Sequence, residues 1–302
     1  MTVYDLKTMQ ICKIEGKTVV ALGTFDGCHI GHASVLRNAF YKAKELGIKS
    51  VAYTFDASFD KGQELICTLD EKIKAIAKFD IDYVAIEGFE NVRELSGEAF
   101  VNRILIGELE AAFATCGFNY RFGKGASCDA QDLTKFMENG GGSVQISPKI
   151  ECDGVAVSST NIRRKIKNGE VEEILGYMRP YSVYAPVQRG KGMGKGLGFA
   201  TINQQIPKGK VVPATGVYIT ECEIGEDVYA SVTNVGYRPT IDGENSLLNM
   251  ETHIMGYTGD LYLSTVRVNF YKRLRDERRF NSVSELVAQV EKDKQEAISY
   301  FK

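Results

Sequence analysis

The first half of the chain alternates short apolar runs with stretches in which apolar residues recur every three or four positions. Residues 18–22 are apolar nearly throughout, which is typical of a strand buried on both faces. A helical pattern follows and ends at Gly47, where a C-cap glycine belongs. Strands are further predicted at residues 50–55, 83–86, 112–116 and 143–150, and helices at 70–79 and 96–110. This alternation predicts an α/β domain with an open parallel sheet and helices on both faces.

The second half of the chain has a different pattern of apolar and turn residues. A helical stretch at residues 161–178 runs into Arg179 and Pro180, and short β-rich runs punctuated by glycine and proline follow it. These runs lie at residues 181–188, 216–223, 228–235 and 264–270. Their number and spacing predict a small antiparallel β-barrel, and the capping box of Ser282 and Glu285 opens a C-terminal helix. We therefore expect two domains, residues 1–179 and residues 180–302.

Composition agrees with two soluble domains. The 302 residues are 44% hydrophobic, which is enough apolar material for two separate cores. The net charge of −2 provides no general attraction to nucleic acid or to an anionic membrane surface, so neither is expected as a partner. No apolar run approaches the roughly 18 residues that a membrane span needs. The sequence is that expected of a cytoplasmic protein.

Cysteine and histidine usage narrows the possible chemistry. The seven cysteines are odd in number and no two have the C-x-x-C spacing, so we interpret them as reduced thiols. Cys28, His29 and His32 form the one close cluster, but nothing adjacent supplies the further ligands of a zinc site. The chain has three histidines in all, and two of them lie in this cluster.

Residues 23–32 read G-T-F-D-G-C-H-I-G-H and lie between a predicted buried strand and a predicted helix. Unpaired N–H groups and the helix dipole favour an anion at such a place, and glycines let a phosphate approach the backbone. His29 and His32 are three residues apart, so they share one face of a first helical turn. A tight turn with two surface histidines is the alternative, but it leaves the clustering of glycines and histidines unexplained.

This segment resembles the signature of the adenylyltransferase half of bacterial bifunctional riboflavin kinase/FAD synthetases. Residues 117–125, G-F-N-Y-R-F-G-K-G, resemble the second motif of that family, and residues 158–163, S-S-T-N-I-R, resemble the third. The resemblance implies a Rossmann-like nucleotidyltransferase domain in which a phosphate oxygen of FMN attacks the α-phosphorus of ATP and pyrophosphate leaves. It implies that His29, His32 and Arg163 neutralise developing charge. The nucleotide-binding residues that it implies are Gly23, Phe25, Asp26, Gly31, Asn119, Ser159 and Thr160. Residues 158–163 are also readable as a plain helix N-cap, and both interpretations can hold together.

The glycine-rich segment at residues 190–198, G-K-G-M-G-K-G-L-G, matches neither common nucleotide fingerprint. The P-loop pattern fails because Gly196 follows Lys195, and the G-x-G-x-x-G pattern fails at every starting glycine. Standing alone, such a run is typical of a surface loop.

The motifs that follow this glycine-rich segment favour a functional interpretation of it. F-A-T-I-N at residues 199–203, N-V-G-Y-R-P-T at 234–240, E-T-H at 251–253 and G-D-L-Y at 259–262 resemble the riboflavin kinase half of the same family. The resemblance implies a small β-barrel kinase domain in which Thr201 and Asn203 bind Mg²⁺ and Glu251 is the catalytic base. It also implies that Gly190, Gly194 and Gly198 contact ATP and that Arg275 lies near the flavin. His253 is expected on the same strand face as Glu251, in a supporting role.

The chain departs from the family pattern at several positions. Ala200 replaces a proline, Ile202 an alanine and Cys128 a glycine, Leu263 stands where a glycine is common, and residues 57–59 replace a Pro-His-Pro. None of these changes removes a residue with an assigned chemical role. We therefore expect both activities, the conversion of riboflavin to FMN and of FMN to FAD, with rates that the departures can alter.

Two other functions remain open at this stage. One half of the chain could be active while the other serves a structural or regulatory purpose, or the whole chain could be a non-catalytic flavin-binding regulator. The retained Glu251 favours catalysis over the second alternative. Assays of each half-reaction separate the three.

Overall fold

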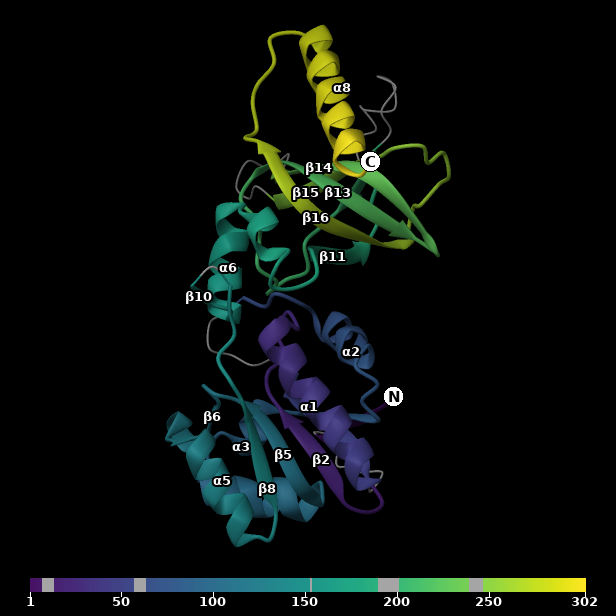
Figure 1. The fold of residues 1–302 in the computed structure, drawn as a ribbon. Coiled ribbons are helices and arrows are strands. Elements are labelled where there is room, and N and C mark those ends of the chain that lie inside the picture. Colours follow the sequence, from purple (N-terminus) through teal and green to yellow (C-terminus); the bar gives the residue numbers. More distant parts are fainter. Residues whose placement is uncertain (7–13, 57–63, 153, 190–200, 239–246) are drawn as a thin grey trace. The chain divides into compact units, whose positions relative to one another are not determined.

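The computed structural model describes residues 1–6, 14–56, 64–152, 154–189, 201–238 and 247–302 (Figure 1). The chain forms two compact units, Met1–Ser159 and Thr160–Lys302. The division therefore falls ahead of the boundary expected at residues 179 and 180. That boundary stays a prediction about where an independently folding domain begins.

A six-stranded sheet forms the centre of the first unit. Its strand order is β1-β4-β3-β2-β5-β8, and all neighbouring strands are parallel. The strands are β1 (Thr2–Asp5), β2 (Thr18–Leu22), β3 (Lys49–Phe55), β4 (Tyr83–Glu87), β5 (Ala111–Gly117) and β8 (Ser143–Ser147). All five residues of β2 are buried, as a central parallel strand covered on both faces requires.

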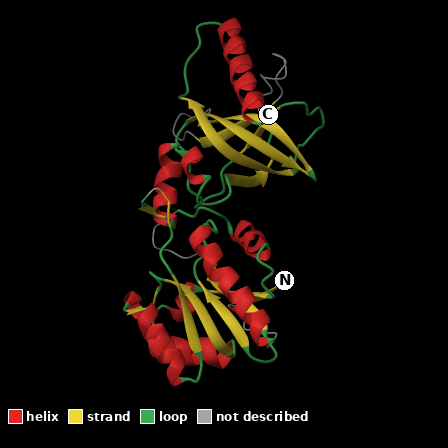
Figure 2. Cartoon of the chain, viewed as in Figure 1, coloured by secondary structure: helices red, strands yellow, loops and turns green. Residues whose placement is uncertain are grey.

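Helices cover both faces of this sheet (Figure 2). Val19 and Ala21 of β2 pack in one core with α1 (Ile30–Leu46) and α2 (Leu69–Ala77), whereas Val20 and Leu22 pack in the other core. That second core contains residues of α4 (Gly97–Phe100), η2 (Val101–Glu108) and α5 (Ala130–Asn139). The remaining short elements are α3 (Phe89–Val92), β6 (Arg121–Phe122), η3 (Lys124–Ala126), β7 (Cys128–Asp129), β9 (Glu151–Cys152) and β10 (Val155–Ala156). The α/β fold predicted for the first half is confirmed.

Several details of the first unit differ from the sequence prediction, including α5, which was not expected. The helix expected at residues 96–110 is a single α-helical turn, α4, that continues as the π-helix η2. The strand expected at residues 143–150 ends at Ser147, because Pro148 has no N–H to donate to a ladder. Strand β1 was not expected, since it is a short edge strand in which mostly exposed residues leave little pattern.

The second unit begins with a broken helix where a continuous one was expected at residues 161–178. Helix α6 (Ser159–Asn168) ends at Gly169, whose φ of 80° is left-handed, and the 3-10 helix η4 (Val171–Ile174) follows. Gly169 is also required sterically. A Cβ there would lie 2.6 Å from Cδ of Arg273, which shows that the end of α6 packs closely against β16 (Thr265–Arg275).

A curled antiparallel sheet forms the body of the second unit, with strand order β11-β16-β13-β14-β15-β12. Its other strands are β11 (Tyr181–Pro186), β12 (Thr201–Gln204), β13 (Gly216–Ile224), β14 (Asp227–Arg238) and β15 (Leu247–Ile254). Its two end strands meet at one bridge, in which the N–H of Gln188 donates to the carbonyl of Asn203 at 2.7 Å. The barrel-like fold predicted for the second half is confirmed.

Aromatic rings and hydroxyl groups fill the interior of this sheet. The rings of Tyr181 and Tyr218 lie 5.5 and 5.3 Å from that of Phe270. A hydroxyl ladder crosses β13, β14 and β15, in which each contact is 2.8 Å long. Its members, all fully buried, are Thr220, Ser231, Thr233 and Thr252.

The C-terminal helix α8 (Val283–Tyr300) packs with its C-terminal part against the outer face of the sheet (Figure 1). Its Ala297 packs in a small core with Val217, Ile219 and Val232, and the Ser282 hydroxyl caps its first turn by accepting the N–H of Glu285 at 3.2 Å. The predicted C-terminal helix is confirmed. Among the described residues, no helix combines the length and the apolar character needed to cross a bilayer.

The docking of residues 160–179 predicts the stability of two fragments. Ile162, Ile166, Val171 and Ile174 are fully buried, and η4 packs against β16. Complete burial of one aliphatic side chain contributes about 1.5–3 kcal/mol, so fragment 180–302 will be less stable than fragment 160–302 by at least about 3 kcal/mol. Urea unfolding followed by circular dichroism measures the difference. Equal midpoints and slopes would show that residues 160–179 add nothing to the second unit.

Candidate active sites

The first candidate site is the β2–α1 turn (residues 23–29), at the carboxyl end of the central strand. His29 is the N-cap of α1, and its Nδ1 accepts a hydrogen bond from the N–H of His32 at 3.3 Å. The two imidazole rings are stacked, with centroids 3.7 Å apart and planes 18° apart. The edge of the Phe25 ring packs against His32, with centroids 5.5 Å apart. The two histidines therefore form a coupled pair at the positive end of a helix.

The backbone of the β2–α1 turn is strained. Phe25, Gly27 and Cys28 have φ values of 49°, 80° and 42°, and left-handed φ costs a residue other than glycine about 1–2 kcal/mol. Strain of this kind concentrates at binding sites, where surrounding contacts hold it. The flanking glycines make room for the strained residues. A Cβ on Gly23 would lie 2.9 Å from the Phe25 ring, and one on Gly31 would lie 3.1 Å from the His29 ring.

Asp26 is directed into the protein rather than toward solvent. The residue is 3% exposed, and its carboxylate accepts a hydrogen bond from the N–H of Ile66 at 2.9 Å. The Ser159 hydroxyl donates to the backbone carbonyl of Asp26 at 3.0 Å. The structure thus brings Ser159 of the third motif to the first motif. Thr160 and Arg163 follow on α6, within the second unit.

Asn119 of the second motif lies just beyond the carboxyl end of β5. A Cβ on Gly117 would lie 3.4 Å from its Oδ1, so the absence of a side chain at Gly117 leaves space beside the Asn119 amide.

Sequence reasoning missed an aromatic cluster that begins near the carboxyl end of β3. Neighbouring ring centroids in it are 5.6 to 5.8 Å apart, and its members are Tyr53, Phe55, Phe89, Phe100, Phe122 and Tyr120. Burial, and then the charge of Glu87, raises the pKa of the Tyr53 hydroxyl well above its usual range, so this group stays protonated. The aromatic residues in the second motif were the available signal.

The second candidate site is a polar row across three strands of the second unit. The register places Glu251 of β15 opposite Asn203 of β12 on one side and opposite Asn234 of β14 on the other. Directly opposed residues of antiparallel strands point to the same face, so the three side chains share one surface. Oδ1 of Asn203 accepts a hydrogen bond from Nδ2 of Asn249 at 3.2 Å, which fixes the orientation of the Asn203 amide. Thr201 and His253 form the next opposed pair on this face.

Gly190, Gly194 and Gly198 lie outside the described residues, but the ends of their segment are defined. The bridge between Gln188 and Asn203 brings together the residues that flank it on both sides. The Arg189 guanidinium lies over the Tyr262 ring, 4.8 Å from its centroid. Tyr262 of the G-D-L-Y motif is therefore next to the start of the glycine-rich segment.

Arg275 is bound to the C-terminal helix. Its Nε and Nη2 donate to the Asp293 carboxylate at 3.1 and 2.7 Å, and Asp293 is 3% exposed. The register aligns Arg275 with Val217, and Val217 with Asn234, so Arg275 continues the row that contains Glu251. Whether Arg275 also contacts a flavin stays a prediction.

Glu277 was not expected near this row. Its Oε1 accepts a hydrogen bond from Nδ2 of Asn234 at 3.0 Å, and a Cβ on Gly236 would lie only 2.0 Å from the same oxygen. Gly236 therefore permits the carboxylate to approach the strand. The signal available in the sequence was its place two residues after Arg275.

Leu263 occupies the position where a glycine is common, and the structure shows the reason for that glycine. Its φ is 65°, it is 71% exposed, and it lies in a turn closed by the N–H of Ser264 and the carbonyl of Leu261 at 2.9 Å. Leu263→Gly removes the left-handed penalty of about 1–2 kcal/mol at an entropic cost of about 0.5–1 kcal/mol, so we expect a gain of about 0.5–1 kcal/mol in denaturant unfolding. Leu263→Ala keeps the Cβ and is the control. An equal gain in both variants would contradict strain as the cause.

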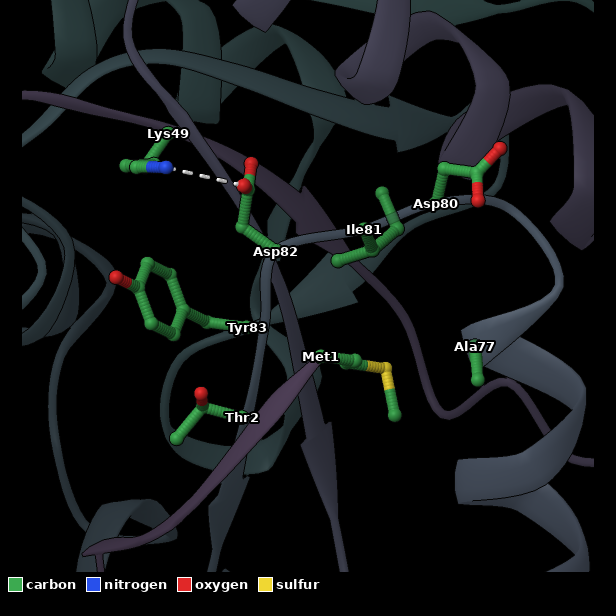
Figure 3. A pocket seen from close by; sticks show the side chains of 8 residues that line it. All are labelled: Met1, Thr2, Lys49, Ala77, Asp80, Ile81, Asp82 and Tyr83. Atoms are coloured by element: carbon green, nitrogen blue, oxygen red, sulfur yellow. Dashed lines mark hydrogen bonds and ion pairs between the residues drawn. The ribbon is translucent and has the colours of Figure 1, made fainter.

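A cavity of about 390 Å³ lies at the opposite edge of the parallel sheet from the β2–α1 turn (Figure 3). It is lined at the amino ends of β1, β3 and β4, where Nζ of Lys49 lies 3.3 Å from Oδ1 of Asp82. Its lining residues are Met1, Thr2, Lys49, Ala77, Asp80, Ile81, Asp82 and Tyr83. None of the residues assigned to a site lines this cavity.

Comparison with known proteins agrees with this division into two sites. Residues 11–161 match the family model for FAD synthetase, and residues 177–301 match the family model for riboflavin kinase. The bifunctional riboflavin kinase/FMN adenylyltransferase of Bacillus subtilis is 33% identical over 95% of this chain and 93% of its own length. The Listeria monocytogenes protein of the same name is 32% identical over 94% of this chain and 92% of its own length.

Among solved structures, that of a protein named macrolide-efflux protein from Streptococcus pneumoniae is similar over 98% of both chains. Its TM-score is 0.86 and its sequence identity 28%. The fold, the order of the motifs and these relatives lead to the same conclusion: the chain belongs to the family of bifunctional riboflavin kinase/FMN adenylyltransferases.

Proposed function

We propose that this protein phosphorylates riboflavin with ATP to give FMN and then transfers AMP from a second ATP to FMN, giving FAD and pyrophosphate. The observation that carries the proposal is the match of both family models, in order, over nearly the whole chain. Both candidate sites retain the side chains that the two reactions need. Riboflavin, FMN, FAD and ATP are the ligands that these activities imply.

Adenylyl transfer at the β2–α1 turn requires no nucleophilic side chain. A phosphate oxygen of FMN attacks the α-phosphorus of ATP, and the bond to pyrophosphate breaks. The protein contributes orientation and positive charge for the phosphate oxygens. His29 and His32 are supported in this role by their position at the start of α1, and Arg163 by its place in the third motif. Gly23, Phe25, Asp26 and Gly31 shape the turn, while Asn119, Ser159 and Thr160 are the proposed polar contacts to the nucleotide.

Phosphorylation of riboflavin requires a base, because the attacking 5'-hydroxyl is neutral. Glu251 takes the proton while the hydroxyl oxygen attacks the γ-phosphorus and ADP leaves. Support comes from the position of Glu251, itself half-buried, in a polar row directly beside Asn203. Gly190, Gly194 and Gly198 are the proposed backbone contacts to ATP, and Arg275 is proposed to act near the flavin.

The donor set beside Glu251 fits Mg²⁺. The Asn203 amide oxygen, oriented by Asn249, and the Thr201 hydroxyl are hard oxygen donors, which Mg²⁺ prefers. Thr201 and Asn203 would hold the ion together with ATP, and its charge would offset that of the phosphates. The cytoplasmic location and the lack of nucleic-acid or membrane partners remain predictions.

One incubation tests the proposed function. Purified protein with riboflavin, ATP and Mg²⁺ should yield FMN and then FAD, separated by chromatography, and supplied FMN should yield FAD directly. Formation of FMN alone, or of FAD from supplied FMN alone, would identify a protein with one active half. Flavin binding without either product would support a regulatory role.

A further inference from the structure

A second segment of the first unit holds the β2–α1 turn in its strained shape. The N–H of Cys67 donates to the Asp26 carboxylate at 3.1 Å, and in return the N–H of Gly27 donates to the Cys67 sulfur at 3.1 Å. Thr68 directly follows and caps α2 in a reciprocal capping box with Glu71. The position of α2 is thus tied to the turn through the Asp26 carboxylate and the N–H of Gly27.

Lys72, in the first turns of α2, extends this support to the strand beside the turn. The residue is 3% exposed, and its Nζ donates to the carbonyl of Phe55 at 2.8 Å and to Oγ1 of Thr54 at 3.4 Å. The Thr54 hydroxyl in turn donates to the carbonyl of Thr24 at 2.9 Å. One hydroxyl therefore links the buried ammonium to the second residue of the turn.

The packing of the core does not require a charged side chain at Lys72. Both oxygens that accept from it, a carbonyl and a hydroxyl, are uncharged, and burial lowers the pKa of its ammonium below the usual value. The surrounding groups that favour the charged form are Cys67, Asp26, Cys28 and Asp56. Burial raises the pKa of the Cys28 thiol to about 12 and that of the Cys67 thiol further still, so both thiols are neutral. Lys72, acting through Thr54, and the Asp26 carboxylate therefore both hold the turn by hydrogen bonds on its buried side.

We propose that Lys72 is a positioning residue of the adenylyl-transfer site, acting through Thr54 and the carbonyl of Thr24 to fix the shape of the β2–α1 turn. The inference rests on the proposed function of that turn. A turn that carries His29 at its end tolerates little displacement, because a shift of about 1 Å in a reacting geometry can cost a factor of about 100 in rate. This role does not require Lys72 to contact either substrate.

The test replaces the ammonium while keeping the length of the side chain. Lys72→Met should lower kcat for FAD formation from FMN about tenfold to a hundredfold, with KM for FMN changed less than about threefold. The thermal midpoint is expected to fall, because the buried carbonyl of Phe55 loses a donor, so kcat is measured at a temperature at which circular dichroism shows the variant to be folded. Lys74→Met changes an exposed lysine of the same helix and should keep the kcat of the unaltered protein.

A second variant covers the case in which Lys72→Met does not fold. Thr54→Val removes the linking hydroxyl and keeps the branched shape, so it should lower the same kcat. If the two residues act through one path, the double variant should be no slower than the slower single variant. Independent, multiplying losses in the double variant, or full kcat in Thr54→Val, would overturn the proposal.

The kinase half-reaction provides the internal reference. FMN formation from riboflavin should be unchanged in all of these variants, because Lys72 lies in the other unit. Absence of FAD formation in the unaltered protein would refute the proposed function itself. Normal FAD formation in folded Lys72→Met would refute only the role of Lys72.

Discussion

The variant H29A/H32A should convert FMN to FAD about a thousandfold to ten-thousandfold more slowly than the unaltered protein. A single transition-state donor of this kind contributes about 3 kcal/mol, which is about a hundredfold in rate. Because the two rings are stacked at 3.7 Å, the single replacements will not be independent, and the double variant will lose less than their product. Single-turnover rates with saturating ATP and FMN measure the loss.

The structure adds a control that the sequence did not suggest. His29 caps α1, so H29A also removes a cap that contributes about 0.5–2 kcal/mol to stability. His29→Asn keeps a side-chain acceptor at the N-cap and removes the imidazole. If H29N folds normally and is as slow as H29A, the imidazole acts in the reaction. Near-normal FAD formation in H29A/H32A would end the assignment, and FMN formation from riboflavin should remain intact throughout.

Glu251→Gln should slow the phosphorylation of riboflavin by a factor of about 100 to 10,000, the range that a positioned general base contributes. The amide nearly preserves size and hydrogen-bonding reach, so the register beside Asn203 and Asn234 should persist. Affinity for riboflavin and MgATP should change little. Rapid-quench measurement of FMN formation separates the chemical step from product release.

Glu223→Gln provides a matched control on β13, where the Glu223 carboxylate lies 3.3 Å from Nε of Arg267. It should leave FMN formation unchanged, and both variants should convert supplied FMN to FAD normally. Full turnover in Glu251→Gln when chemistry limits the rate would exclude Glu251 as the base. Loss of ligand binding with normal turnover at saturation would instead make Glu251 a binding residue.

The sequence predicted the elements whose packing surfaces are simple. The buried strand at residues 18–22 and the helix after it were clear from the sequence. The strand is apolar nearly throughout because both of its faces are buried, and the helix has a regular apolar period because it buries one face. Strands β12 and β15 were not predicted from pattern. One of their faces carries the polar row with Asn203 and Glu251, while the other carries Gln204 and Thr252 inside the sheet. With polar residues on both faces, the period of two that marks a strand disappears.

The candidate sites were predictable where a motif is continuous and hidden where a site depends on distant contacts. His29 and His32 share one helical turn, so spacing alone placed them together. The contacts of Asp26 with Ile66, of Lys72 with Thr54 and of Arg275 with Asp293 join segments that no local pattern connects. They are consequences of sheet order and helix packing, which single-sequence patterns do not encode.

The hydrogen bonds of the hydroxyl ladder inside the second unit do not depend on pH. Each threonine or serine hydroxyl can donate to one neighbour and accept from another, and none of these groups ionises in the range where proteins fold. The direction of donation can also reverse along the whole row by rotation of hydrogens alone, without displacement of a heavy atom. The centre of this unit therefore keeps the same set of hydrogen bonds at any pH at which the unit is folded, whatever the protonation state of Glu251 on the other face of the sheet.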